Sequence, residues 1–265
     1  SCSDKDNGME QTEPNDPDDP QGPQIRKYGT MKFIGHLDVM RYFQKAIRRS
    51  EVNIRYSEGF SPHQIMSFAA PLGVGITSKG EYVDIEVLDT ENSKKMIDRL
   101  NAVMSEGFEI LEYKLLPDDA ANAMSIVAAA DYSLVFRPGY EPEKESPEEW
   151  FEKLVRFFDA DHVMIMKKTK KGEREMDLKP FVYELNVRKN GEVPALFMKV
   201  SAGSAANIKP ELVLDAYYAS LGEERPQFAF MTEREEVYAD TATAEEAEAG
   251  THKFVTLGDL GQDIE

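Results

Sequence analysis

The sequence predicts an α+β protein made of two ferredoxin-like halves, each in the split βαβ order of strand–helix–strand–strand–helix–strand, with disordered acidic tails. Three observations lead to this prediction. The predicted elements follow that order between residues 25 and 116, and a weaker copy follows between residues 131 and 238. The ends of the chain, residues 1–24 and 239–265, are acidic and poor in apolar side chains. Residues 117–130 are then the linker between two domains.

The first half contains the clearest helix, His36–Arg49. Its apolar residues recur at helical spacing and predict one buried stripe, made of Leu37, Met40, Phe43 and Ile47. Residues 80–88 alternate between apolar and polar side chains, which is typical of a half-buried strand. The remaining elements are strands at 25–28, 31–34, 53–56, 65–68 and 108–116, and a helix at 93–104 that Ser93 is expected to cap.

The second half has the same order with weaker signals. Ser146 and Pro147 open a helix at residues 147–158, because serine caps helices and proline suits their first turn. Pro210 starts the second helix, residues 210–220, in the same way. Strands are expected at 132–136, 162–166, 181–187, 195–200 and 227–231. An irregular α+β arrangement is the alternative for this half, since no short sequence repeat supports a duplication.

The charge of the chain is strongly negative, with a formal net charge of −18, but it is unevenly distributed. Each tail carries seven acidic residues against a single lysine, Lys5 or Lys253. Such tails cannot bury enough apolar surface to offset the entropy of ordering, so we expect both to be disordered, with weak docking of residues 253–260 as the alternative at the far end. Acidic tails can also accompany a functional surface of opposite sign in the middle of the chain.

Cysteine content and hydropathy exclude several classes of protein. Cys2 is the only cysteine, so the chain has no disulfide framework, thiolate zinc site or iron–sulfur ligand set. No apolar run has the length needed to span a membrane, and no signal peptide is visible. We therefore expect a cytoplasmic protein without a membrane partner, with lipidation of Cys2 as the alternative.

A basic helix face is the strongest local electrostatic feature. Eight basic residues occur between positions 26 and 55, against two acidic ones, Asp38 and Glu51. Arg41, Lys45 and Arg48 are spaced to line one face of the first helix beside its apolar stripe. Guanidinium groups grip phosphate oxygens, so this face together with Arg55 predicts contact with RNA. The alternative is a solvated face paired with carboxylates elsewhere.

The stretch RYSEGFSPH, residues 55–63, predicts a rigid polar loop. Gly59 permits a sharp turn, and Pro62 restricts the residue before it. Such a loop would hold Ser57, Glu58, Phe60 and His63 for contact with a ligand. His63 could also act as a general acid or base oriented by Glu58, although the serines are typical of turn caps.

His36 opens the basic helix, where the helix dipole disfavours its charged form. His36 is the second catalytic candidate besides His63, and a capping or packing role is its alternative. His36, Asp38, Glu58 and His63 could meet at a metal ion only if the fold brought them together, so no metal and no cofactor is predicted. Residues 71–75, PLGVG, form a glycine-bearing loop that would let a phosphate approach backbone N–H groups, a weak signal by itself.

Several of these segments together resemble a known family: residues 33–38, Arg41, residues 56–63, residues 67–69 and residues 71–74. They are similar to the radical-SAM-linked bacterial domain of unknown function, which is fused to, or encoded beside, cobalamin-binding radical SAM proteins. The resemblance covers residues 26–116 most specifically, with residues 177–180 and 208–210 as weaker landmarks. The chain departs from the pattern at residues 64–66, QIM, where the family usually has proline followed by a basic residue.

The resemblance implies a non-catalytic accessory domain that works with a radical SAM enzyme in RNA modification or a ribosome-related system. With the basic helix, it predicts binding of tRNA or rRNA by ten residues: His36, Asp38, Arg41, Lys45, Arg48, Arg55, Ser57, Glu58, Phe60 and His63. Two alternatives remain open. One is a protein–protein adaptor, which requires an exposed apolar patch on the sheet. The other is a metal-independent endoribonuclease using His36, by architectural analogy with CRISPR repeat-processing enzymes.

Overall fold

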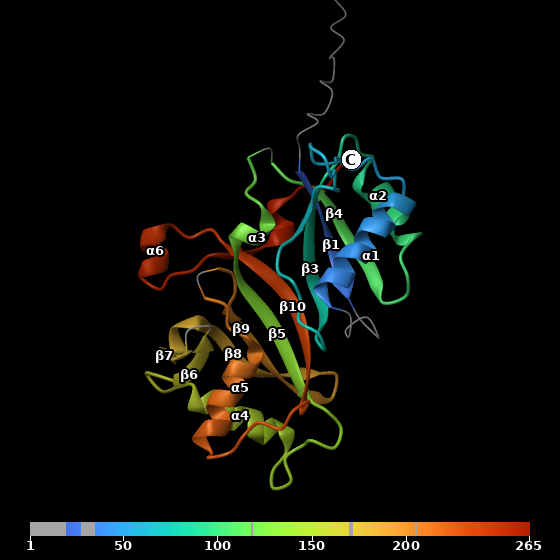
Figure 1. The fold of residues 1–265 in the computed structure, drawn as a ribbon. Helices are drawn as coiled ribbons and strands as arrows, with labels where there is room; N and C mark the ends of the chain where they lie inside the picture. The colour runs from blue at the N-terminus through green and yellow to red at the C-terminus, as the bar shows by residue number, and fades with distance from the viewer. Residues whose placement is uncertain (1–19, 28–34, 118, 170–171, 205) are drawn as a thin grey trace, which may run out of the picture.

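The computed structural model describes residues 20–27, 35–117, 119–169, 172–204 and 206–265. It confirms the α+β class. The main sheet has the order β4-β1-β3-β10-β5-β9-β8, with β2 beside β3 and β11 beside β10. Figure 1 shows the two halves stacked along the long axis of the molecule, with β5 and β10 running through its centre. The predicted strand at residues 31–34 and the tail residues 1–19 lie outside the described residues, whereas residues 20–24, predicted to be part of the disordered tail, belong to the first strand.

The first half has the ferredoxin-like topology that the sequence predicts. Strands β4, β1, β3 and β2 lie side by side in that order, and every neighbouring pair is antiparallel. Helices α1 and α2 pack with them around one apolar core. The elements are β1 (Pro20–Lys27), α1 (His36–Arg49), β2 (Met66–Phe68), β3 (Thr77–Glu86), α2 (Ser93–Asn101) and β4 (Phe108–Leu115).

The second half repeats the topology, so its regular arrangement rather than the irregular alternative is observed. Strands β10, β5, β9 and β8 are neighbours, and each pair is antiparallel. Helices α4 and α5 cover one face over a core that includes Trp150, Phe151 and Leu196. The elements are α3 (Ala123–Ile126), β5 (Val127–Phe136), α4 (Pro147–Phe157), β8 (Val182–Asn190), β9 (Val193–Ser201), α5 (Pro210–Ser220) and β10 (Phe230–Asp240).

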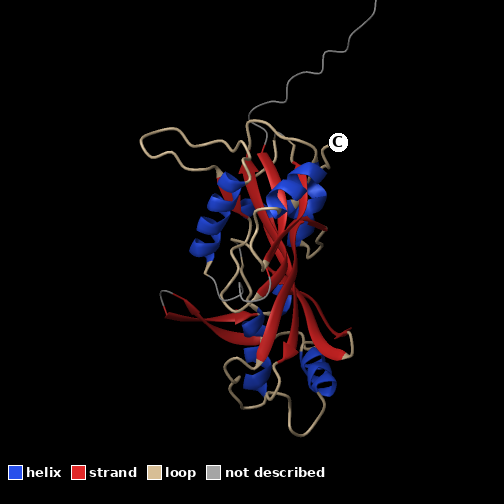
Figure 2. Cartoon of the chain, turned by 90° about the vertical axis from the view of Figure 1, so that its right-hand side faces the viewer, coloured by secondary structure: helices blue, strands red, loops and turns tan. Residues whose placement is uncertain are grey.

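A two-stranded hairpin is inserted between α4 and β8. It consists of β6 (Met164–Thr169) and β7 (Gly172–Asp177) and forms its own small sheet, followed by the 3-10 turn η2 (Lys179–Phe181). In Figure 2 the hairpin projects from the side of the molecule. Asp177 anchors its base, because its carboxylate accepts hydrogen bonds from the backbone N–H groups of Val163 and Lys179.

The two halves are joined by strand pairing. The beginning of β3 pairs in parallel with β10, with Ser78 opposite Arg234, while the later part of β3 pairs with β2. Gly80 lies at this crossing, where a Cβ atom would be 2.6 Å from the carbonyl oxygen of Glu235. Tyr82 adds a hydrogen bond across the junction to Glu236, 2.8 Å long. The halves therefore share one sheet, with glycine required at their closest approach.

The buried stripe of α1 differs from the predicted one. Val39, Phe43, Ala46 and Ile47 are buried, whereas Leu37 is 62% exposed and Met40 is only half-buried. The helical period allows either assignment at the first turn, because both stripes include Phe43 and Ile47. Contact with Phe68 of β2 and Phe108 of β4 selects the face that carries Phe43.

Other predicted boundaries also shift. The predicted linker, residues 117–130, contains α3 and the first residues of β5. Ser146 and Pro147 do open α4, through a capping box with Glu149. In α2, however, Asn92 and not Ser93 is the N-cap, and the Ser93 hydroxyl instead accepts the backbone N–H of Ile264. Residues 53–56 form only isolated bridges, and the last strand of the second half is β10, which starts three residues after the predicted position 227.

The prediction that the acidic C-terminal segment, residues 239–265, is disordered is wrong, and the alternative of docking at residues 253–260 is the one observed. It completes β10 and continues through α6 (Ala244–Glu248), β11 (Phe254–Thr256) and the 3-10 helix η3 (Leu257–Leu260). Strand β11 pairs with the end of β10, and Leu257 is 5% exposed. Backbone pairing lets a segment with few apolar residues fold, because the rest of the molecule supplies the surface on which it packs.

Candidate nucleic-acid interface

Helix α1 presents the basic face that its sequence predicts. Arg41, Lys45, Arg48 and Arg49 are exposed along the helix, with Arg48 and Arg49 in its last turn, where cations oppose the helix dipole favourably. Arg41 makes a solvent-exposed ion pair with Asp38, at 3.4 Å. Among the described residues, Lys45 and Arg48 have no ion-pair partner. These two cations are therefore available to an anionic ligand.

The loop at residues 57–63 is closed at its base by one serine–histidine pair. The backbone N–H of His63 donates to the Ser57 hydroxyl at 3.1 Å, and the same hydroxyl lies 2.8 Å from Nδ1 of the His63 ring. The backbone N–H of Ser57 donates in turn to the carbonyl of His63. Since the hydroxyl accepts from the backbone, its own proton can be donated to Nδ1. Ser57, and not Glu58, is thus the partner that the structure gives to the imidazole.

The tip of this loop is an aromatic side chain in solvent. Phe60 is fully exposed, and Gly59 before it has φ +112°, the left-handed region that favours glycine. An exposed phenylalanine cannot be explained by the core, and the hydrogen bonds at the base of the loop fix where it projects. Glu58 is also exposed at the tip. The loop presents one apolar ring with a carboxylate beside it.

The loop lies against the basic helix. Tyr56 and Gln64 form an antiparallel bridge just outside the Ser57–His63 pair. The buried Gln64 side chain donates from Nε2 to the carbonyl of Gln44 in α1, at 3.3 Å. Gln44 lies three residues after Arg41 and four before Arg48, so the contact places the loop next to the helix segment that carries both arginines. Sequence reasoning missed Gln64, because nothing in a lone glutamine indicates a buried contact.

Arg55 and His36 have surroundings that the sequence did not indicate. Arg55 is half-buried and pairs with Glu86 of β3 at 3.8 Å, which partly neutralises its charge. The His36 ring packs edge-on against Phe68, with ring centres 5.4 Å apart. In the described part of the chain, no three His, Cys, Asp or Glu side chains gather in a way that could hold a metal ion.

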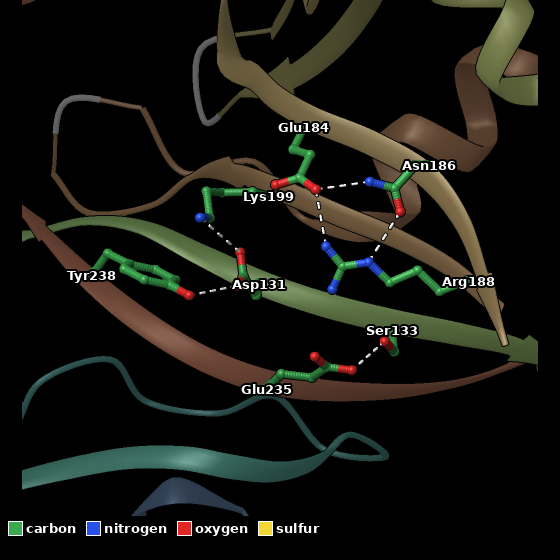
Figure 3. A network of polar contacts seen from close by, with 8 residues as sticks. All are labelled: Asp131, Ser133, Glu184, Asn186, Arg188, Lys199, Glu235 and Tyr238. Atoms are coloured by element: carbon green, nitrogen blue, oxygen red, sulfur yellow. Dashed lines mark hydrogen bonds and ion pairs between the residues drawn. The ribbon is translucent and has the colours of Figure 1, made fainter. Parts of the chain in front are cut away.

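The face of the second-half sheet opposite α4 and α5 carries a polar network (Figure 3). Tyr238 donates to Asp131 at 2.6 Å, and Lys199 lies 3.9 Å from the same carboxylate. Burial raises the pKa of Asp131. The remaining members pair with one another: Ser133 with Glu235, and Arg188 with Glu184 and Asn186. This polar region is not the apolar sheet patch that the adaptor hypothesis requires.

Comparison with known proteins places the chain in a family. A family model described as "Uncharacterized protein conserved in bacteria (DUF2344)" matches residues 24–210. The chain belongs to this family. The match runs from β1 to the first residue of α5, so it includes α1, the loop at residues 57–63 and most of the second half. The description names no radical SAM protein, so that partner remains a prediction from the sequence.

Two further comparisons, with curated proteins and with solved structures, indicate no function for the chain. No curated protein matches the chain. One solved structure that the chain matches is titled "Crystal Structure of a Cbf5-Nop10-Gar1 Complex"; it is 11% identical, with a TM-score of 0.41, and the match covers 81% of this chain and 48% of that one. The chain thus spans about half the length of that protein, and the likeness is too weak to support a function. None of the described helices has the length and apolar character needed to cross a membrane.

Proposed function

We propose that the chain is a non-catalytic accessory module that binds RNA, either tRNA or rRNA, through α1 and the loop at residues 57–63. The observation that carries the proposal is the fully exposed Phe60 on a hydrogen-bonded loop held against a basic helix. Proteins that bind single-stranded RNA combine these two elements, an aromatic ring on which a base stacks and cations that track the backbone.

The charge of the interface supports RNA more than a protein ligand. Arg41, Lys45, Arg48 and Arg49 are exposed on a chain whose formal net charge is −18. Electrostatic attraction to phosphates acts locally, because at physiological salt charges more than about 8 Å away are largely screened. The acidic residues elsewhere on the molecule would then discourage RNA from binding at other faces.

The arrangement of the two histidines favours binding over cleavage. The Nδ1 atom of His63 is engaged by Ser57, and the ring is exposed on the loop, whereas the His36 ring packs against Phe68. Among the described residues, no carboxylate pairs with the His63 ring. A radical SAM enzyme as the partner follows from the sequence resemblance, and co-purification of such an enzyme with the full chain would test it.

The experiment is fluorescence anisotropy with labelled tRNA and rRNA fragments over a salt series. The double variant Arg41→Glu/Arg48→Glu removes two candidate phosphate contacts and should lower affinity at least tenfold. It should also reduce the slope of log K against log salt by about 2, since each lost contact contributes about 1. Circular dichroism would verify that the variant folds.

A matched control reverses the same number of charges in the other half. Lys153→Glu/Arg156→Glu changes two exposed cations on α4 and should leave affinity within about twofold of the parent. Equal losses in both double variants would mean that net charge alone governs binding. Absence of binding at low salt would overturn the proposal and favour the adaptor.

A further inference from the structure

A cavity of about 520 Å³ lies where the two halves meet. It is bounded by the segment between β2 and β3, the start of β5, the turn after β9, the first turn of α5 and one residue of β10. Two of the segments on which the family resemblance rests, residues 71–74 and 208–210, approach one another here. The polar and glycine residues of its wall are Gly73, Gly203, Ser204, Asn207, Lys209, Glu211 and Arg234.

Arg234 is the unusual member of this wall, because it is a buried cation to which the described part of the chain offers no counter-charge. Its residue is 3% exposed. One terminal nitrogen donates to the backbone carbonyl of Ala70 at 2.7 Å, but Nε has no hydrogen-bond partner. No carboxylate in the described residues pairs with it. A guanidinium cannot lose its proton in a protein, and a buried unpaired charge is strongly unfavourable. An anionic ligand would supply the missing partner.

The first turn of α5 adds a second positive feature. Pro210 is the first residue of this 11-residue helix, and its N-cap Lys209 makes no side-chain capping bond. The N-terminus of such a helix attracts anions through its dipole, and the exposed Lys209 ammonium adds a full charge. Glu211 is the acidic group on the wall and opposes these effects. With Arg234 and Lys209 against Glu211, the charged side chains of the wall have a net positive charge.

Backbone geometry brings donors to the same cavity. Gly203 has φ +102°, and a Cβ atom there would lie 2.1 Å from the carbonyl oxygen of Val127, so only glycine lets this turn approach β5. Gly73 and Val74 also line the cavity; both residues are exposed, and their backbone N–H groups make no backbone hydrogen bond to another described residue. Unpaired amides of this kind are typical of anion-binding loops.

We propose that this cavity binds a phosphate monoester of mononucleotide size, with the phosphate paired to Arg234 and held near Lys209 and the first turn of α5. The volume exceeds what a lone phosphate needs and lies in the range of small-molecule sites. Apolar residues of the wall, including Leu72 and Tyr132, would contact the body of the ligand. The proposal does not depend on RNA binding by α1, which lies in the first half.

The test is isothermal titration of the full chain with adenosine 5′-monophosphate, inorganic phosphate and adenosine. The monophosphate should bind, and adenosine should bind at least tenfold more weakly, because it lacks the charge. Arg234→Gln should reduce affinity for the monophosphate at least tenfold, and Lys209→Ala several-fold. Lys189→Ala, a surface lysine of β8 outside the cavity, is the matched control and should have no effect.

Melting temperatures separate a ligand role from a structural one. Removal of an unpaired buried charge should leave the ligand-free Arg234→Gln protein about as stable as the parent, while the monophosphate no longer raises its melting temperature. If Arg234→Gln does not fold, the comparison rests on Lys209→Ala, which changes an exposed residue. No binding of phosphate or monophosphate at millimolar concentration, or binding unchanged in both variants, would overturn the proposal.

The phosphate could belong to a free nucleotide or to the 5′ end of an RNA strand. A short oligonucleotide with a 5′-phosphate, compared with its 5′-hydroxyl form, distinguishes the two sources. A phosphate-dependent preference that Arg234→Gln abolishes would assign the site to an RNA end, and binding of the monophosphate without such preference to a free nucleotide. Arg41→Glu/Arg48→Glu should retain binding of the monophosphate, so failure of the RNA proposal leaves this test intact.

Discussion

At the scale of single residues, Phe60 is the side chain whose position is hardest to explain by stability. It is fully exposed, whereas the other phenylalanines nearby, Phe43 and Phe68, are buried. A buried phenylalanine stabilises a fold by removing its ring from water, and Phe60 makes no such contribution. The sequence indicated a rigid loop here, and the Ser57–His63 pair supplies the rigidity through atoms that no spacing pattern specifies.

Phe60→Ala should therefore separate binding from stability. We expect its melting temperature to stay within about 1 °C of the parent, because surface substitutions usually change stability by less than about 0.5 kcal/mol. Affinity for single-stranded RNA should fall by about 1–3 kcal/mol, the range for one stacked base. Thermal denaturation and anisotropy on the same sample measure both. Unchanged affinity would show that Phe60 is not part of the interface. Phe68→Ala is the contrasting variant, because removing this buried ring should unfold the first half.

Asp84 of β3 gives a pH-dependent prediction. Burial raises the pKa of its carboxyl above the ordinary value of 3.8, although the backbone N–H of Ala123 donates to it at 2.8 Å. The folded state then binds the proton more tightly than the unfolded state, so this contribution to stability is present at low pH. It is lost as the pH rises through the interval above 3.8.

Asp84→Asn should raise stability at pH 7, on the order of 1 kcal/mol, because a neutral amide can accept the same hydrogen bond without burying a charge. The gain should disappear at acidic pH, as denaturation at several pH values would show. Asp177→Asn is the control of opposite sign, since the hydrogen bond from His162 lowers the pKa of Asp177. A loss of stability in Asp84→Asn at pH 7 would contradict the argument.

At the scale of elements, helix starts were easier to predict than helix faces. The Ser146 capping box of α4 follows a local pattern of four residues, so it can be recognised without the fold. In α2 the same local reasoning selected Ser93, but the preceding Asn92 is the cap and Ser93 bonds to Ile264, 171 positions later in the chain. Local capping rules hold where no distant residue forms a hydrogen bond with the expected capping side chain.

Pairing of β3 with β10 depends on Gly80. Gly80→Ala would place a Cβ atom 2.6 Å from both the Glu235 carbonyl oxygen and the Glu236 Cα, so one strand must move. We expect a loss of about 3 kcal/mol or more in the free energy of unfolding, at the upper end for overpacking. Urea denaturation measures it. Gly73→Ala is the control, because a Cβ atom there would contact only Ile76, at an ordinary 3.5 Å, and the substitution should cost less than about 1 kcal/mol. Equal losses in the two variants would refute this account of the junction.

At the scale of the whole molecule, the C-terminal segment contacts both halves. Gln262 pairs with Leu115 of β4, and Ile264 contacts the core of the first half, while β11 extends β10 of the second half. Figure 1 accordingly shows the C-terminus close to α2. An acidic segment that could not fold alone is thus ordered by surfaces that both halves provide.

Leu257→Ala tests whether this segment belongs to the cooperative fold. Leu257 is buried beside Tyr82 and Val237, so truncation should cost about 2–4 kcal/mol and shift a single unfolding transition to lower urea. Leu37→Ala removes the same atoms from an exposed position on α1 and should cost less than about 0.5 kcal/mol. A small effect of Leu257→Ala, or a separate early transition, would show that the segment folds independently of the rest.

The sequence by itself determined the α+β class, the order of elements in both halves and the basic face of α1, because these depend on composition and on local periodicity. Only the tertiary structure decided which stripe of α1 is buried, that the C-terminal segment is ordered and that Arg234 and Lys209 line one cavity. Each of these depends on contacts between residues far apart in the chain, such as Arg234 with Ala70, 164 positions away. Local propensities contain no information about such distant partners, and packing and pairing between the halves select them.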